Sequence, residues 1–265
     1  MEKWFFILPY TYGFSTRAKT LVHRLSFIAL IFIPILLHVI IITDCNFSFV
    51  LYCAGFTSMY ATYEIGYIYN DVYTVLKESK PTKWLTEKSN VFVQNSYPIL
   101  ISCRVVWIFI CMIVMKKQHA VNILGFVGCL CLVHFVFSLH NYFRGIQNIF
   151  TNGGLQVLKY ISVLLLFGTG KNLLLHSGFI YFEIAFERTI EYAISKKYIL
   201  VDKKINIDNF RIIYYFVLSV VSFMLYVMSR RYIGLLLGSS YLMFYRVICK
   251  LLISNNKIVE SRVKQ

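Results

Sequence analysis

The sequence predicts an all-α protein: a polytopic transmembrane helical bundle of about eight transmembrane helices, with its N-terminus in the cytoplasm. Three observations lead to this prediction. Of the 265 residues, 58% are hydrophobic and 15% are charged, whereas a soluble domain of this length carries roughly 25% charged residues. Apolar runs long enough to cross a bilayer repeat along the chain. Lys and Arg gather in alternate connections between these runs, as in proteins that keep their positive loops inside.

A membrane-spanning helix needs roughly 20 mainly apolar residues. The runs that meet this requirement lie at about 25–43, 47–69, 97–115, 120–139, 154–169, 172–192, 210–228 and 232–252. The fifth and sixth runs are short and closely joined through Gly168-Thr169-Gly170, so a re-entrant segment is an alternative there. Nine spans are a further alternative, although a ninth span would place the basic C-terminal tail outside.

The distribution of positive charge predicts the orientation. With the N-terminus inside, the inside connections hold 18 Lys and Arg residues, and the outside connections hold five, which are Lys116, Lys117, Lys171, Arg230 and Arg231. We therefore expect both termini in the cytoplasm if the helices number eight.

A single transmembrane domain is expected over residues 1–265. Residues 1–24 form a cytoplasmic, amphipathic and basic N-terminus in which we recognise no cleavable signal peptide. Two cytoplasmic loops are long, one at 70–96 and the other at 193–209. The richness in Ile, Phe, Tyr, Lys and Asn is typical of an AT-rich genome, which favours a multi-pass protein of a bacterial inner (cytoplasmic) membrane.

Charge and cysteine content exclude several classes of function. The net charge of +15 does not indicate nucleic-acid binding, because the cations lie in short loops between apolar runs. The seven cysteines include no CxxC pair and lie mostly in apolar runs, where thiols behave as small hydrophobic groups. Neither a zinc site nor a disulfide framework is expected.

A first acidic cluster lies at the end of the second apolar run. Asn70, Thr74 and Glu78 are spaced by four and share one helix face, with Asp71 beside Asn70 and Glu64 two turns upstream. Mg²⁺ prefers one or two carboxylates together with substrate phosphates and water. The cluster is consistent with a metal–diphosphate site, and the alternative is a polar helix end that meets water.

A second acidic cluster consists of Glu183, Glu187 and Glu191, again spaced by four. Charges in a membrane helix are costly and normally face the bundle interior or a wet cavity. Three like charges at this spacing repel one another, so a cation must offset them or they must be protonated. A divalent metal, a basic partner and an interhelical ion pair with Arg104 or Lys159 are the alternatives.

Basic residues flank both acidic clusters. The first loop carries Lys77, Lys80, Lys83 and Lys88, and the second carries Lys196, Lys197, Lys203 and Lys204. Positive-inside sorting accounts for most of them, but the same side chains could bind phosphate oxygens. Arg144 follows the fourth run in His140-Asn141-Tyr142-Phe143-Arg144, where we expect a helix cap with one phosphate contact.

The order of the two acidic clusters resembles the UbiA-type intramembrane prenyltransferases, which carry NDxxDxxxD after their second helix and a second acidic motif near the end of the sixth. Asn70-Asp71-x-x-Thr74-x-x-x-Glu78 falls on the first motif, with Thr for the middle Asp and Glu for the last. Glu183-x-x-x-Glu187-x-x-x-Glu191 falls near the second. Asn70-Asp71-Val72 followed by Pro81-Thr82-Lys83 is similar to the first loop of the polyprenyl-phosphate phosphoribosyltransferases in this superfamily.

This resemblance implies a Mg²⁺-dependent transferase that moves a group between a diphosphate-containing donor and a polyprenyl lipid, with phosphoribosyl transfer to polyprenyl phosphate as the best single hypothesis. Asp71 and Glu187 are then the catalytic residues. The residues implied to hold the metal are Asp71, Glu78 and Glu187. Those implied to bind substrate are Asn70, Lys83, Arg144, Glu191 and Lys197.

Two hypotheses from other classes stay open. A transporter or flippase for a lipid-linked or small solute would use Glu183, Glu187, Arg104 and Lys159 as a proton or substrate relay. A non-catalytic membrane component of polysaccharide assembly would depend on no single acidic residue.

Overall fold

The computed structural model describes residues 6–75, 84–143, 145–198 and 206–254, and every regular element in these ranges is helical. The first half contains α1 (Thr11–Thr16), α2 (Leu21–Phe27), the π-helical η2 (Ile28–Phe32), α3 (Ile33–Ile42), α4 (Phe49–Tyr69), the π-helical η3 (Asn70–Thr74), α5 (Glu87–Asn95) and α6 (Tyr97–Lys117). The second half contains α7 (Ile123–Tyr142), α8 (Asn148–Leu164), α9 (Gly170–Ile180), the π-helical η5 (Tyr181–Ala185), α10 (Phe186–Ser195), α11 (Ile207–Met228), the 3₁₀ turn η6 (Arg230–Tyr232) and α12 (Ile233–Ser254).

Each apolar run predicted from the sequence falls on a long helical segment. These segments differ in whether they are long and apolar enough to cross a membrane. Five segments in the described part of the chain are both long and apolar enough to cross a membrane: Leu21–Ile42, Tyr97–Lys117, Ile123–Tyr142, Ile207–Met228 and Arg230–Leu252. The chain is therefore a helical integral membrane protein. The count of eight spans and the bacterial inner membrane stay predictions.

Polar residues set the helix boundaries. Ser48 caps α4 by accepting from the Leu51 amide at 3.2 Å, and Asn122 caps α7 by accepting from the Gly125 amide at 2.7 Å. Such caps satisfy amides that have no partner inside the helix. Pro98 lies in the first turn of α6, where its missing N–H costs nothing.

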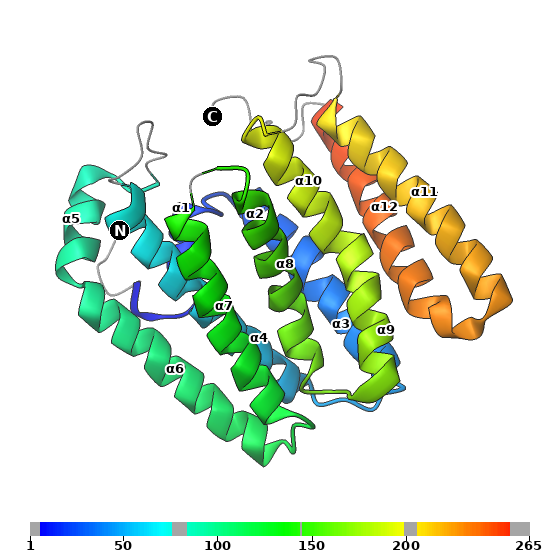
Figure 1. The fold of residues 1–265 in the computed structure, drawn as a ribbon, viewed down its shortest axis with the longest axis horizontal. Coiled ribbons are helices and arrows are strands. Elements are labelled where there is room, and N and C mark those ends of the chain that lie inside the picture. The colour runs from blue at the N-terminus through cyan, green and yellow to red at the C-terminus, as the bar shows by residue number, and fades with distance from the viewer. Residues whose placement is uncertain (1–5, 76–83, 144, 199–205, 255–265) are drawn as a thin grey trace.

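Successive long helices run in alternate directions and lie side by side (Figure 1). Helix α4 packs against α6, α7 and α8, and α3 packs against α8, α9 and α12. The α11–α12 hairpin forms one edge of the bundle, and α6 lies at the other edge. Helix α4 is mostly buried, whereas the outer helices expose large apolar side chains such as Phe109 and Met228, as lipid-facing helices do.

The N-terminal segment folds into the bundle instead of lying on it. Tyr12 is fully buried and the Gly13 amide donates to Glu64 Oε1 at 2.8 Å. Arg104, also fully buried, donates through Nε to Glu64 Oε2 at 3.1 Å. Its other nitrogens donate to the backbone carbonyls of Phe6, Ile7 and Leu8. One buried ion pair thus fixes the segment that precedes the first long helix.

We expect Glu64→Gln to destabilise the protein by roughly 3–5 kcal/mol, because the substitution leaves the Arg104 charge buried without its partner. The melting temperature in detergent and trypsin cleavage at Arg17 measure this effect, since release of the N-terminal segment exposes that bond. Glu87→Gln, at an exposed carboxylate, is the matched control. Equal melting temperatures and equal cleavage rates for the two variants would contradict the prediction.

Candidate functional site

The first acidic cluster is built around Asp71, which lies in the π-helical turn η3 and is 7% exposed. Arg17 holds both of its carboxylate oxygens, with Nη1 on Oδ2 and Nη2 on Oδ1, the latter at 2.7 Å. The Tyr12 hydroxyl donates to Oδ2 at 2.6 Å. Burial and the neighbouring Asp71 charge raise the pKa of Tyr12, so this hydroxyl keeps its proton and remains a donor.

Aromatic rings enclose the Arg17 guanidinium. Its central carbon lies 4.6 Å from the centre of the Tyr67 ring and 5.2 Å from the centre of the Trp84 ring. Cation–π contacts of this kind stabilise a desolvated guanidinium. The cluster therefore holds one arginine rigidly at the end of α4.

The remaining residues of the first motif are described only in part. Asn70 is half-buried and its Nδ2 lies 3.4 Å from Asp71 Oδ1, and Thr74 is buried. Glu78 and Lys83 lie outside the described residues, and so does Arg144.

The second acidic cluster is an arginine-rich network. Glu187 is fully buried and its Oε1 accepts from Arg211 Nε at 3.2 Å and from Arg246 Nη2 at 3.1 Å. Glu191 also contacts Arg211, and its Oε2 lies 3.5 Å from Arg188 Nη1. Arg211 Nη1 also pairs with Asp208 Oδ1 at 2.6 Å, so three arginines from α10, α11 and α12 face three carboxylates. The partner predicted for this cluster, Arg104, instead pairs with Glu64.

Glu183 belongs to a separate buried network. Its Oε2 lies 2.8 Å from His38 Nε2, and His38 Nδ1 lies 2.8 Å from His176 Nδ1. Gly238 and Gly234 on α12 leave room for this chain of side chains, because a Cβ at Gly238 would overlap the Glu183 carboxylate and one at Gly234 would lie 2.8 Å from the His176 ring. Glu183 Oε1 has no hydrogen-bond partner among the described residues.

Two further predicted residues are placed differently. Lys159, a predicted partner of the second cluster, is 6% exposed, and its Nζ lies 4.6 Å from the centre of the Tyr63 ring. No ion pair joins it to a carboxylate in the described part of the chain. Lys197 is exposed after the end of α10 and has a φ of 59°.

The two acidic motifs lie towards the same end of the bundle, because α4 and α10 run in the same direction (Figure 1). No hydrogen bond or ion pair joins Asp71 to Glu187 within the ranges that the structure describes. Nor does any group of three or more His, Cys, Asp or Glu side chains there have an arrangement that could hold a metal ion. Both carboxylates face arginines, so the described donors do not fit Mg²⁺, and the metal stays a prediction.

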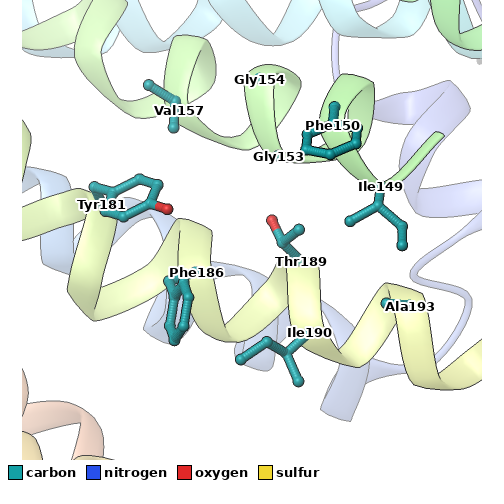
Figure 2. A pocket seen from close by; sticks show the side chains of 10 residues that line it. All are labelled: Ile149, Phe150, Gly153, Gly154, Val157, Tyr181, Phe186, Thr189, Ile190 and Ala193. Atoms are coloured by element: carbon teal, nitrogen blue, oxygen red, sulfur yellow. The ribbon is translucent and has the colours of Figure 1, made fainter. Parts of the chain in front are cut away.

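An apolar groove of about 380 Å³ lies between α8 and the segment formed by η5 and α10. Gly153 and Gly154 lie opposite Thr189 across the groove (Figure 2). The hydroxyls of Tyr181 and Thr189 are its side-chain polar groups, and the other lining side chains are apolar.

Sequence analysis missed the residues that compensate the acids. The sequence places Arg17 among the inside cations that set the orientation, and it predicts His38 as a buried packing or hydrogen-bonded histidine; in neither case does it indicate a partner for the acids. Arg188 and Arg246 gave a usable signal, because each is an arginine within or beside a membrane-length apolar run. Intramembrane charges pair with one another, so these two arginines were candidate partners for the second acidic cluster.

We expect Gly238→Ala to lower the melting temperature in detergent, by an amount that corresponds to roughly 1–3 kcal/mol, because the added methyl group displaces the Glu183 carboxylate in a packed core. Gly178→Ala is the matched control, since a Cβ there meets nothing within 4 Å. If both variants melt together with the unmodified protein, the close approach of α12 to Glu183 is not a structural constraint.

Comparison with protein-family models, with curated proteins and with solved structures gave no match to this chain. Its function is therefore inferred from the residues of the two acidic motifs and from the contacts that they make.

Proposed function

We propose that this chain is a membrane-embedded transferase of the UbiA type, which moves a group between a diphosphate-containing donor and a polyprenyl lipid at the cytoplasmic membrane surface. Phosphoribosyl transfer to polyprenyl phosphate is the specific reaction that we propose. The observation that carries the proposal is the pair of acidic motifs, each of which holds arginine side chains towards the same end of the bundle.

Arginine is suited to phosphate because its planar guanidinium presents five N–H donors in a fixed geometry. Arg17 uses its two terminal nitrogens on Asp71 and Thr16, which leaves donors for a further acceptor. In the second cluster Arg188, Arg211 and Arg246 face the three carboxylates of Glu187, Glu191 and Asp208, and each guanidinium has more N–H donors than these contacts use. Incoming phosphate oxygens would meet preorganised donors, which stabilise charge that develops on a leaving diphosphate.

The catalytic assignment rests on what each acidic residue holds. Asp71 fixes Arg17 against Tyr67, and Glu187 fixes Arg211 and Arg246. If Mg²⁺ is required, as the family resemblance implies, Asp71 and Glu78 are the carboxylates of this motif that would hold it, and the metal would neutralise charge on the diphosphate. The apolar groove beside α10 would accept the hydrocarbon chain of the lipid from the bilayer.

We expect phosphoribosyl diphosphate to bind the purified protein in detergent, and we expect Asp71→Ala and Arg17→Ala to lose at least about 1.5–3 kcal/mol of that binding, the usual contribution of a hydrogen bond to a charged group. Calorimetric titration with Mg²⁺ and with EDTA measures the metal requirement. Glu87→Ala is the control, because its carboxylate is exposed.

Binding that disappears in EDTA and in Asp71→Ala supports a metal–diphosphate site at the first motif. Binding that persists in EDTA but disappears in Arg17→Ala supports recognition by arginine. If phosphoribosyl diphosphate and farnesyl diphosphate both fail to bind the unmodified protein, the transferase proposal is wrong.

A transporter or flippase is the second candidate, favoured by one specific observation. His176, His38 and Glu183 form a hydrogen-bonded chain inside the bundle, and Glu187 and Glu191 continue along the same helical segment. The distance from His176 to Glu191 along a helix is about 22 Å at 1.5 Å per residue. Buried ionisable groups in such a column are typical of proton pathways.

For that candidate, we expect reconstituted vesicles loaded with a pH-sensitive dye to take up protons under an imposed potential. Glu183→Gln and His38→Ala should abolish this flux, whereas Asp71→Ala should retain it. A flux that Glu183→Gln leaves unchanged, or an absence of flux in the unmodified protein, would count against a proton-coupled transporter.

A further inference from the structure

A second basic site lies beside the Asp71 cluster, where the first long helix begins. A cavity of about 340 Å³ opens there between the N-terminal segment, the start of α2 and the start of α5. Its polar lining comes from Ser15, Lys19, Arg24, Thr86 and Ser89.

The two cations of this cavity have no acidic partner in the described part of the chain. Lys19 Nζ donates to the Trp84 carbonyl at 3.2 Å, and Arg24 Nε donates to the Ala18 carbonyl at 3.2 Å. Each of these hydrogen bonds uses one N–H group, so Lys19 and Arg24 both have further donors. Glu87 is exposed and does not line the cavity. Within the described residues the lining of this site therefore carries two cations, an exposed Lys19 and a half-buried Arg24, and the nearest carboxylate in sequence is Glu87 in the first turn of α5.

The start of α5 adds to that positive field. Thr86 caps this helix by accepting from the Ser89 amide at 3.3 Å, and its hydroxyl lies 2.9 Å from Ser89 Oγ. The first turn of a helix carries partial positive charge and free N–H groups, which favour anions. Ammonium, guanidinium, hydroxyls and a helix N-terminus thus converge on one cavity.

The position of the cavity limits the kind of anion. Leu21 and Leu25, in the first turns of the long apolar segment, are 70% and 55% exposed, so lipid begins at this level. Phe6, Phe14 and Leu85 form an apolar wall of the same cavity. A ligand with a charged head and a hydrocarbon tail satisfies both surfaces.

We propose that this cavity binds the phosphate head group of a membrane lipid. Lys19 and Arg24 bind the phosphate oxygens, Thr86 and Ser89 add hydroxyl contacts, and the aromatic wall contacts the start of the tail. This goes beyond the proposed transfer reaction, because the cavity contains neither Asp71 nor Glu187.

The test is calorimetric titration of the detergent-purified full chain with dihexanoyl phosphatidic acid, inorganic phosphate and inorganic diphosphate. We expect the lipid phosphate to bind most tightly, and Lys19→Gln/Arg24→Gln to weaken it about tenfold or more, because charge-assisted hydrogen bonds are lost. Lys116→Gln/Lys117→Gln is the matched control, since it removes the same charge from exposed positions in the last turn of α6 that do not line the cavity. The conservative variant Lys19→Arg/Arg24→Lys, which keeps both charges, should bind within a few-fold of the unmodified protein.

If inorganic diphosphate binds as tightly as the lipid and loses its binding in the same double variant, the cavity binds a free anion, and the lipid assignment is wrong. If the double variant and the control lose the same affinity for the lipid phosphate, net charge alone explains the loss, and the proposed site is wrong. The proposed site is also wrong if the double variant melts like the unmodified protein and binds the lipid phosphate with unchanged affinity. Asp71→Ala separates this site from the proposed function, because it should abolish phosphoribosyl diphosphate binding and leave lipid-phosphate binding intact.

Discussion

The ion pair between Glu64 and Arg104 is the interaction on which the end of the bundle that holds the N-terminal segment depends. Both side chains are fully buried, and an isolated charge in that environment would be very costly. The two side chains therefore also hydrogen-bond to the N-terminal segment. Glu64 accepts from the Gly13 amide, and Arg104 donates to three backbone carbonyls. Docking of that segment in turn brings Tyr12 and Arg17 to Asp71, so the first acidic motif is completed by residues more than 50 positions away.

The cost of an unpaired charge away from water also explains why apolar helices lie at the outside of the bundle and helices with carboxylates lie inside it. Outer helices such as α6 and α11 bury few of their residues and meet lipid with apolar side chains. Helices that carry carboxylates, such as α4 and α10, must place them inside, because lipid offers no partner. Two of the three π-helical segments, η3 and η5, carry Asp71 and Glu183. Single π-helical turns inside α-helices are frequent at functional sites. Here two of them lie where an apolar helix carries a buried acidic side chain.

The positions of the helices could be predicted from the sequence, because a run of apolar residues specifies a membrane helix almost by length alone. The burial of Glu183 and Glu187 was also predictable, since a carboxylate on an apolar helix cannot face lipid. Which helix supplies each partner was not. Spacing by four predicts a shared face, but it does not tell which helix lies opposite. Glu183 meets His38 from α3, whereas Glu187 meets Arg211 and Arg246 from the α11–α12 hairpin.

These partners divide the interior into two kinds of polar system. Arg17, Arg211 and Arg246 stay charged at any physiological pH, so their networks supply permanent donors that suit an anionic substrate. Glu183 instead meets His38, which meets His176, and no arginine contacts these three side chains among the described contacts. Glu183 and Glu187 are only one helical turn apart, so the charge of one network acts on the other through low-dielectric protein. For the transferase that we propose, anion binding at the arginine network would therefore depend on the charge of the Glu183 network, and the less negative that network is, the more it would favour the anion.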